Sequence, residues 1–280
     1  MGKRLLLASF GLAALLVVAP PAARPSAYTI EPCLKSKLCT GLVEHFNMND
    51  LSDYGRYGAF GSVLHERIGS NIGSAAGKIG NAVDLAGTST SYLWSSTFVP
   101  TMSMNWSASF WFKADTLPSP GTYATFISRS GGNNAGTSIS LYNNAGTTKV
   151  RIYTWDREAT TKPATDSSTT IVAGTWYFVA AGVGDPDEPG LGLGTQQWVS
   201  VNGGTKQTTD LNYIPRSGLS HLRVGQTPSA GKAADGGESF DGLLDELSFF
   251  GRSIGLSDIT LLCNDLGSGC TGLTYPFVTE

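Results

Sequence analysis

The sequence predicts an all-β protein in which two antiparallel sheets pack face to face. Short segments rich in aromatic and β-branched residues alternate with clusters of Gly, Asn, Pro and Ser, which is typical of strands joined by tight turns. The 280 residues include 35 glycines, so many turns are expected. No helical spacer separates the predicted strands, and strands without helical connections form sandwiches.

The N-terminal residues 1–27 have the organisation of a secretory signal peptide. Lys3 and Arg4 precede an apolar stretch from Leu5, and prolines and small residues follow it. The stretch is shorter than the roughly 20 residues that span a membrane, which favours cleavage over a retained anchor. Cleavage is expected after Ala27, with Ala23 as the rival position. The mature chain is therefore expected to be secreted, to an extracellular or periplasmic space, without a membrane segment.

Four cysteines flank the strand-rich region. Cys33 and Cys39 precede it, in the segment 28–40, and Cys263 and Cys270 lie near its end. An even number of cysteines in an exported chain predicts two disulfide bonds, and the sequence leaves the three pairings open. A zinc site is the alternative, but the spacing within each pair is wider than in the usual zinc knuckle.

The strands are expected to form one domain over residues 41–264, followed by a C-terminal tail over 265–280. The predicted strands are Ser107–Ala114, Lys149–Trp155, Thr175–Val183, Gln197–Gly204, His221–Gln226 and Leu243–Phe250. The segments NNAG at 143–146 and NGG at 202–204 predict hairpin turns, because Asn and Gly tolerate positive φ. One short helix is expected from Ser257, which could cap it, with Leu256 and Leu261 as a hydrophobic staple.

The last predicted strand, within FDGLLDELSFFGR at 240–252, places two acids in an apolar run. Because strand side chains alternate between the two faces of a sheet, Asp245 and Glu246 are expected to point in opposite directions. The alternation assigns one face to Leu243, Asp245, Leu247 and Phe249, and the other to Leu244, Glu246, Ser248 and Phe250. A buried carboxylate needs a charge partner or several hydrogen bonds.

The order of these segments resembles the laminin-G-like jelly-roll domain of the concanavalin A-like lectin/glucanase superfamily. The resemblance is carried by LVEHFNMNDLSDYGRYGAFG (42–61), GKIGNAVDLAG (77–87), MNWSASFWFKAD (104–115), GTWYFVAAGV (174–183), WVSVNG (198–203) and FDGLLDELSFFGRSIGLSDI (240–259). It implies a curved jelly-roll sandwich of two antiparallel sheets, commonly used outside cells to bind glycans or proteins.

The same resemblance implies a structural calcium ion. Asp245 stands at a position that helps to hold calcium in many relatives, and Asp53 lies in the matching early loop. Calcium takes about six to eight oxygen ligands, which loops beside a strand end can supply. The alternative is that Asp245 is satisfied by backbone amides or by an arginine such as Arg252.

The acidic residues do not form a pattern that predicts catalysis. The Glu-x-Asp-x-x-Glu strand of glucan-cleaving relatives is absent from the sequence. Asp241 and Asp245 are about 13 Å apart along an extended strand, farther than the roughly 5–10 Å between the carboxyls of a glycosidase. The histidines at 45, 65 and 221 are scattered, and no G-x-S-x-G motif occurs. We therefore expect a protein that is not an enzyme, with a glycan hydrolase as the weaker alternative.

Binding of carbohydrate is the favoured function, because aromatic rings in loops or on the solvent face can stack on sugars. The candidates are Trp155, Tyr153, Tyr142 and Trp94, for which filling of the sandwich is the competing interpretation. Trp111, Trp176 and Trp198 lie in apolar patterns and are expected in the core. A structural or adhesive role through protein contacts is the alternative. The formal net charge of −3, without a basic block, argues against a nucleic-acid partner.

Overall fold

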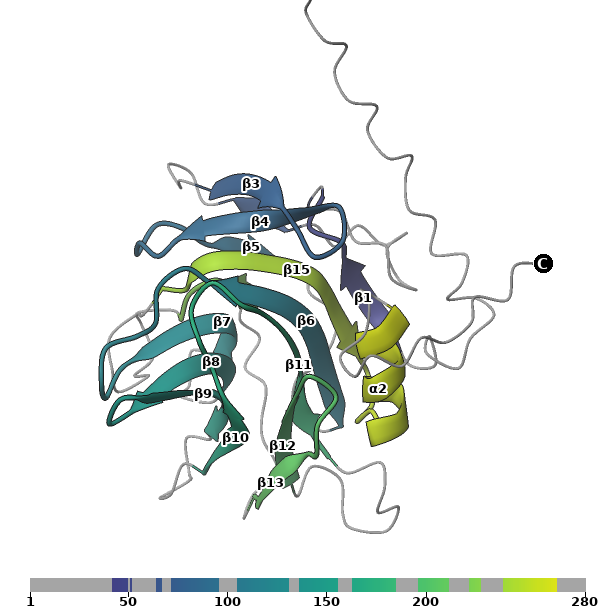
Figure 1. The fold of residues 1–280 in the computed structure, drawn as a ribbon. Coiled ribbons are helices and arrows are strands. Elements are labelled where there is room, and N and C mark those ends of the chain that lie inside the picture. Colours follow the sequence, from purple (N-terminus) through teal and green to yellow (C-terminus); the bar gives the residue numbers. More distant parts are fainter. Residues whose placement is uncertain are drawn as a thin grey trace, which may run out of the picture.

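The computed structural model describes residues 42–49, 51, 64–66, 72–95, 105–130, 136–155, 163–184, 196–211, 222–227 and 239–265. These residues form two antiparallel sheets and one helix, as the sequence predicts (Figure 1). The eight-stranded first sheet has the order β13 (Gln207–Asp210), β12 (Gln196–Val201), β11 (Trp176–Val183), β6 (Trp106–Ala114), β15 (Asp241–Phe250), β4 (Asn81–Ala86) and β3 (Ile72–Ala76), with β1 (Leu42–Phe46) paired to β15.

The seven-stranded second sheet carries the middle of the chain. Its order is β10 (Ala164–Thr170), β9 (Thr147–Trp155), β8 (Gly136–Asn144), β7 (Tyr123–Ser130), β14 (Leu222–Val224), β5 (Leu93–Ser95) and β2 (His65–Glu66). The chain crosses repeatedly between the sheets, so each sheet contains strands from distant parts of the sequence. This is the arrangement of a jelly-roll sandwich.

Aromatic side chains from both sheets fill the space between them. The ring of Phe112 lies 4.5 Å from that of Phe126, 5.5 Å from that of Tyr177 and 6.2 Å from that of Phe240, measured between centroids. Phe112, Phe126 and Phe240 are fully buried. Aromatic pairs in this range stabilise a core beyond the area that they remove from water.

Helix α2 (Leu256–Asp265) covers part of the outer face of the first sheet (Figure 1). Its Ile259, Leu262 and Cys263 join a second buried cluster with Trp111, Phe178, Trp198 and Phe250. The predicted burial of the tryptophans is thus confirmed for Trp111 and Trp198, but they pack under the helix rather than between the sheets. Trp176 packs against the same cluster and is partly buried.

The cap of α2 differs from the one that the sequence predicts. Ser257 lies inside the helix, one residue after its start. The amide of Ile259 donates to the carbonyl of Gly255, and the Asp258 carboxylate accepts the Gly255 amide at 3.2 Å. Gly255 is therefore the cap residue, and Asp258 is the acid that reaches back to it, as in a capping box.

The two predicted turns are confirmed. Between β8 and β9, Ala145 and Gly146 have φ of 51° and 97°, and between β12 and β13, Asn202 and Gly203 have φ of 53° and 68°. Positive φ at consecutive turn residues matches the right-handed twist of the strands they join. Asn143 adds a side-chain acceptor for the amide of Gly146 at 2.8 Å.

Strand β15 does not keep the alternation that the sequence predicts. A bulge interrupts its pairing with β6 between Asp245 and Ser248, and Glu246 there has φ of 54°. Leu244, Leu247 and Phe249 consequently face the core, whereas Phe250 faces the helix. The expected grouping of Asp245 with Leu247 and Phe249 is wrong, because the extra residue of a bulge shifts every later side chain to the other face.

Several predictions concern residues outside the described ranges. These are the signal peptide over 1–27, the segment 28–40, Asp53, and the cysteines at 33, 39 and 270, so these predictions stay predictions. Cys263 is fully buried on the side of α2 that packs against the first sheet. Among the residues that the structure describes, no helix has the length and apolar character of a membrane span.

Candidate functional site

Asp245 lies on the outer face of the first sheet and is fully buried. Its Oδ2 accepts the amide of Ile79 at 2.9 Å, within the turn that joins β3 to β4. Its Oδ1 is buried and has no hydrogen-bond partner among the described residues. Burial raises the pKa of Asp245 to about 7, and the charge of Glu246 adds to the rise, whereas backbone amides at 78, 79 and 246 oppose it. The carboxyl therefore has backbone partners but no described cation.

The β3–β4 turn connects this carboxylate to the early loop. Asn49 accepts the amide of Asn81 through its Oδ1 at 2.7 Å, while Asp245 accepts that of Ile79. A Cβ on Gly77 would lie 2.6 Å from Asp245 Oδ2, and one on Gly80 would lie 2.7 Å from Asn49 Oδ1. The turn is thus held between Asn49 and Asp245, and both close approaches require glycine.

Next to Asp245, three polar side chains form a buried network that tethers β1 to β15. His45 Nδ1 lies 2.8 Å from Ser248 Oγ, and His45 Nε2 lies 3.2 Å from Glu246 Oε2. His45 and Glu246 are 6 % and 1 % exposed. Strict alternation predicts that Asp245 and Glu246 point to opposite faces of the sheet. The bulge at Glu246 breaks this alternation and allows Glu246 to contact His45. Because all of these groups are buried, they stabilise the sheet rather than face a substrate.

The four aromatic residues predicted to bind sugar are spread over one face of the second sheet. Side chains at opposed positions on neighbouring antiparallel strands point to the same face. The pairing places Tyr153, Ser138, Ser128, Arg223 and Trp94 in one row across the sheet. Tyr142 and Trp155 share this face, since each stands at an even number of residues from a member of the row.

This surface, which we call the outer face of the second sheet, points away from the core. The intervening residues Ile139, Leu141, Val150 and Ile152 belong to the main core cluster. Tyr142, Tyr153 and Trp94 are half-buried, whereas Trp155 is 2 % exposed. The Tyr153 and Trp155 rings lie 5.4 Å apart. Trp155 therefore supports Tyr153, and the other three rings keep more surface toward solvent.

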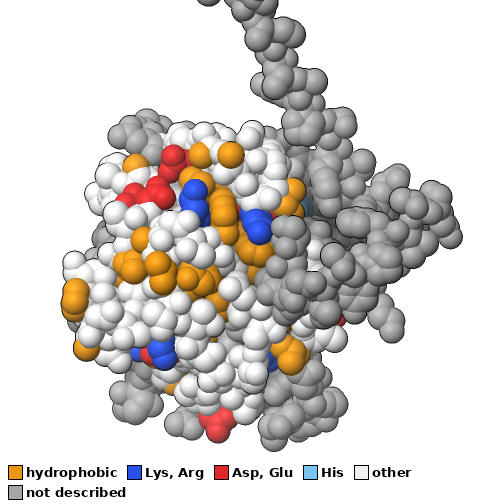
Figure 2. All heavy atoms as spheres, viewed as in Figure 1, with side chains coloured by type: hydrophobic (Ala, Val, Ile, Leu, Met, Phe, Trp, Pro, Cys, Tyr) orange, Lys and Arg blue, Asp and Glu red, His pale blue; other side chains and the backbone are white. Residues whose placement is uncertain are grey.

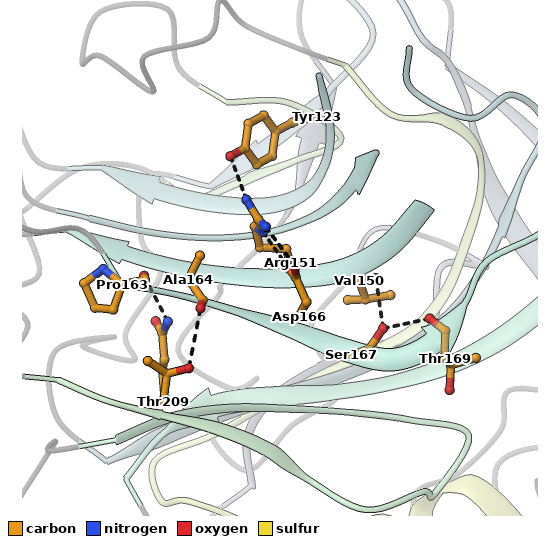
Figure 3. A network of polar contacts seen from close by, with 10 residues as sticks. Tyr123, Val150, Arg151, Pro163, Ala164, Asp166, Ser167, Thr169 and Thr209 are labelled. Carbon is orange, nitrogen blue, oxygen red and sulfur yellow. Dashed lines mark hydrogen bonds and ion pairs between the residues drawn. The ribbon is translucent and has the colours of Figure 1, made fainter. Parts of the chain in front are cut away.

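A polar network fixes one end of this face (Figure 3). Arg151 makes a two-pronged ion pair with Asp166 of β10, with distances of 2.5 Å and 2.8 Å. A third guanidinium N–H donates to the hydroxyl of Tyr123 at 3.1 Å. The guanidinium also lies 3.6 Å from the ring centroid of Tyr142, which is 4.6 Å from the ring of Tyr123. The two tyrosine rings are therefore held in place by Arg151.

Comparison with known proteins identifies the family of this chain. A laminin-G-type family model, described as the concanavalin A-like lectin/glucanases superfamily, matches residues 86–260. The chain belongs to that superfamily. No curated protein sequence matches it. The predicted resemblance and fold class are both confirmed, and the described strands supply the two-layered jelly roll of the superfamily.

Solved structures with a similar fold include one domain of an arabinanase and the binding domains of several toxins. Domain 4 of AbnA, an extracellular arabinanase from Geobacillus stearothermophilus in complex with arabinotriose, has a TM-score of 0.55 and 22% identity over 81% of this chain and 98% of that chain. The binding domain of Paraclostridial Mosquitocidal Protein 1 has a TM-score of 0.62 and 15% identity over 82% of this chain. The binding domain of botulinum neurotoxin DC in complex with SialylT has a TM-score of 0.58 and 14% identity over 82%.

The chain spans about half the length of the two toxin binding domains, 53% in each case. At these sequence identities the similarity concerns the fold alone. A binding site in this chain has to be argued from its own residues. Sequence reasoning missed Tyr123, Arg151 and Asp166, which carry the polar network. The ion pair could not be predicted from local sequence, because Arg151 and Asp166 become neighbours only when β9 pairs with β10.

Proposed function

We propose that this chain is an exported, non-catalytic module that binds carbohydrate through the outer face of its second sheet. The observation that carries the proposal is the placement of Tyr142, Tyr153 and Trp94 on that one face. Half-buried aromatic rings that are held by their neighbours suit the stacking of sugar rings. The arabinotriose complex of the similar arabinanase domain supports the same chemistry.

The absence of catalysis is part of the proposal. Asp245 and Glu246 are neighbours in sequence, but both are buried within a network that ties strands together. Asp241 is the first residue of β15, four residues before Asp245. Neither arrangement offers two carboxyls on opposite sides of an open sugar site, which glycoside hydrolysis requires.

The surface charge is compatible with a largely neutral ligand. On the face drawn in Figure 2, the Lys and Arg side chains are few and scattered, and one of them lies against an acidic side chain. The chain has a formal net charge of −3. A nucleic-acid partner would instead need clustered cations along its phosphates. We therefore favour carbohydrate, and an extracellular protein is the alternative partner.

We also propose a structural calcium ion beside Asp245. The unpaired, buried Oδ1 of Asp245 and the amide oxygen of Asn49 are of the oxygen type that calcium prefers, and the two residues grip the same turn. Within the described ranges, no three His, Cys, Asp or Glu side chains lie close enough together to hold a metal ion. Backbone oxygens and oxygens of the early loop, including those near Asp53, would therefore have to supply the remaining calcium ligands. When bound, the ion would neutralise the buried carboxylate.

Secretion and two disulfide bonds complete the proposal. They rest on the signal-like residues 1–27 and on the four cysteines. An oxidising compartment would allow the buried Cys263 to attach the end of α2 to a second part of the chain. N-terminal sequencing of the secreted protein and mass spectrometry without reduction test these two points.

A glycan array probed with the full chain tests the main proposal. We expect defined glycans to bind, and we expect Tyr142→Ala and Tyr153→Ala to abolish their signal while both variants keep the melting temperature within a few degrees. Silence on the array, together with capture of an extracellular protein, would support the adhesive alternative. Release of reducing sugar from a bound glycan would contradict the non-catalytic part.

A further inference from the structure

A pocket of about 300 Å³ lies at the rim of the sandwich, beside the outer face of the second sheet. Its lining comes from four separate parts of the chain. Gly87 follows β4, Thr116 and Leu117 follow β6, and Tyr123 begins β7, while Ser239 and Asp241 lie at the start of β15. None of the sequence-predicted site residues lines it.

The lining combines one carboxylate with neutral polar and apolar groups. Thr116 Oγ1 donates to Asp241 Oδ2 at 2.7 Å, and the described hydrogen bonds of the Asp241 carboxylate involve Oδ2 alone. Oδ1 therefore keeps its acceptor capacity for a ligand hydroxyl. Ser239 also lines the pocket, and its Oγ is buried without a hydrogen-bond partner within the described part of the chain. Leu117, which is 36% exposed, supplies an apolar edge.

The floor and one wall of the pocket are rigid. Gly87 has φ of 65°, and a Cβ there would lie 2.7 Å from Asp241 Cβ, so glycine lets the turn approach the acid closely. Tyr123 is held by the hydrogen bond from Arg151 and by its contact with the Tyr142 ring. Figure 3 shows Arg151 between Tyr123 and Asp166, so the ion pair fixes the aromatic wall. Preorganised groups of this kind lower the cost of ordering a site on binding.

We infer that this pocket is a subsite for one neutral sugar ring of a glycan that continues onto Tyr142. The inference rests on the proposed carbohydrate-binding function and names its ligand class. A pocket of about 300 Å³ lies at the lower end of the range for small ligands, which suits about one sugar ring. An aromatic wall, a carboxylate acceptor and hydroxyls are complementary to a ring with vicinal hydroxyl groups.

The charge of the lining decides between neutral and acidic sugars. Asp241 is the charged member of the described lining, and no described Lys or Arg lines the pocket. A uronic or sialic acid would bring its carboxylate into a site without a compensating cation, and like charges in a confined site repel. Neutral sugars donate hydroxyl hydrogens to the carboxylate without that repulsion.

Titration calorimetry on the full chain tests the inference with two sets of probes. The neutral set is arabinotriose, xylotriose, cellotriose and mannotriose, and the acidic set is 3′-sialyllactose and trigalacturonic acid. We expect the best neutral trisaccharide to bind at least about tenfold more tightly than either acidic probe.

Asp241→Asn is the decisive variant, because Asn keeps an acceptor for Thr116 but removes the charge. We expect it to weaken the best neutral ligand about tenfold, as loss of a charged hydrogen-bond acceptor does, and to narrow the gap between neutral and acidic probes. Asp210→Asn is the matched control, since Asp210 lies on the distant strand β13 and accepts a hydrogen bond from Gln196 of β12. Melting curves of both variants establish that the fold is kept.

The outcomes separate the pocket from the proposed function. If Tyr153→Ala abolishes binding while Asp241→Asn leaves both affinity and neutral preference unchanged, the pocket inference is overturned and the binding face stands. Tighter binding of an acidic probe by the wild type would also overturn the inference. If no probe and no array glycan binds, the proposed function and the inference are both overturned.

Discussion

Arg151 organises the outer face of the second sheet at the scale of single residues. Its guanidinium is engaged by the Asp166 carboxylate, by the Tyr123 hydroxyl and by the Tyr142 ring. A two-pronged contact with a carboxylate fixes the plane of a guanidinium as well as its position. Arg151 is therefore a positioning residue for the two tyrosines rather than a group that waits for a ligand.

Replacing Asp166 tests this role. In Asp166→Asn the ion pair loses its charge and one acceptor, so we expect a loss of about 1–2 kcal/mol in the free energy of unfolding and weaker glycan binding. Urea unfolding and glycan titration measure the two effects. Asp210→Asn, at an exposed contact on β13, should change neither quantity by much. If the two substitutions changed the free energy of unfolding and the glycan affinity equally, the Arg151 network would not position the two tyrosines.

Gly77 gives a second residue-scale prediction. A Cβ at this position would lie 2.6 Å from Asp245 Oδ2 and 2.8–2.9 Å from the backbone of residues 81 and 82. Backbone cannot yield cheaply, so Gly77→Ala should lower the free energy of unfolding by about 2–4 kcal/mol. Gly73→Ala on the same hairpin is the matched control, because its Cβ would meet the Asp84 side chain at 3.3 Å. A difference of less than about 1 kcal/mol between the two variants would contradict the close packing under Asp245.

Single residues were the least predictable part of the molecule. The sequence correctly singled out Asp245 as an acid that needs partners, and backbone amides proved to be among them. It could not reveal the bulge at Glu246, because a bulge is defined by pairing with β6, far away in the sequence. For the same reason it could not join His45 to Glu246, which are neighbours only after β1 pairs with β15.

At the scale of elements, helix α2 covers part of the outer face of the first sheet. Ile259 is fully buried in the cluster that contains Trp198 and Phe250, whereas Leu256 is 41% exposed at the start of the helix. Trp198 also donates its Nε1–H to Ser253 Oγ at 2.9 Å, just before the helix. The segment after β15 is thus attached by both apolar and polar contacts.

The two helix residues offer a matched pair of substitutions. Ile259→Ala should cost about 2–4 kcal/mol in the free energy of unfolding, because it leaves a cavity under the helix. Leu256→Ala should cost less than about 1 kcal/mol, since much of that side chain already contacts water. Thermal and chemical unfolding of both variants provide the measurement. If Leu256→Ala proved the more damaging of the two, the helix would not be docked as described.

Elements were predicted better than residues. Alternating aromatic and β-branched residues located β6, β9, β11 and β12 to within a few positions, and Asn-Gly chemistry located two turns. The longer strands β7, β8 and β10 are rich in Ser and Thr and were not predicted. Strand β3, with the sequence IGSAA, carries little apolar pattern and was also not predicted. The helix was predicted at its place, but its cap was assigned to Ser257 because a glycine cap gives no side-chain signal.

At the scale of the whole molecule, the Asp245 region joins the beginning of the domain to its end. Asn49 of the early loop and Asp245 of the last strand both hold the β3–β4 turn. The expected tie between position 245 and the early loop therefore runs through this turn. A cation at Asp245 would strengthen it, because the carboxylate is buried and its Oδ1 is unpaired among the described residues.

Chelation tests the proposed calcium ion. A ligand present at about 100 times its dissociation constant adds about 2.7 kcal/mol, so EDTA should lower the melting temperature of the wild type by about 5–10 °C. Asp245→Asn should melt at the same temperature with and without EDTA. Asp84→Asn, on the neighbouring strand β4, should keep the difference. Identical wild-type curves in the two buffers would exclude the ion.

The whole-molecule fold was predictable, whereas the ligand was not. Strands without helical spacers and six ordered segments were sufficient for the sandwich and its superfamily, which the family match confirms. The face that carries Tyr142, Tyr153 and Trp94 emerges only from strand pairing, and the rim pocket joins residues from four separate turns and strand ends. A sequence pattern reports local periodicity only. Surfaces that are assembled from distant segments therefore cannot be predicted from it.

A crystal structure of the full chain with the strongest hit of the glycan array tests the central claim most directly. We expect sugar density against the outer face of the second sheet, in contact with Tyr142 or Tyr153 and reaching toward Tyr123 and Asp241. Density confined to the first sheet, at α2 or at the Asp245 region, would contradict it.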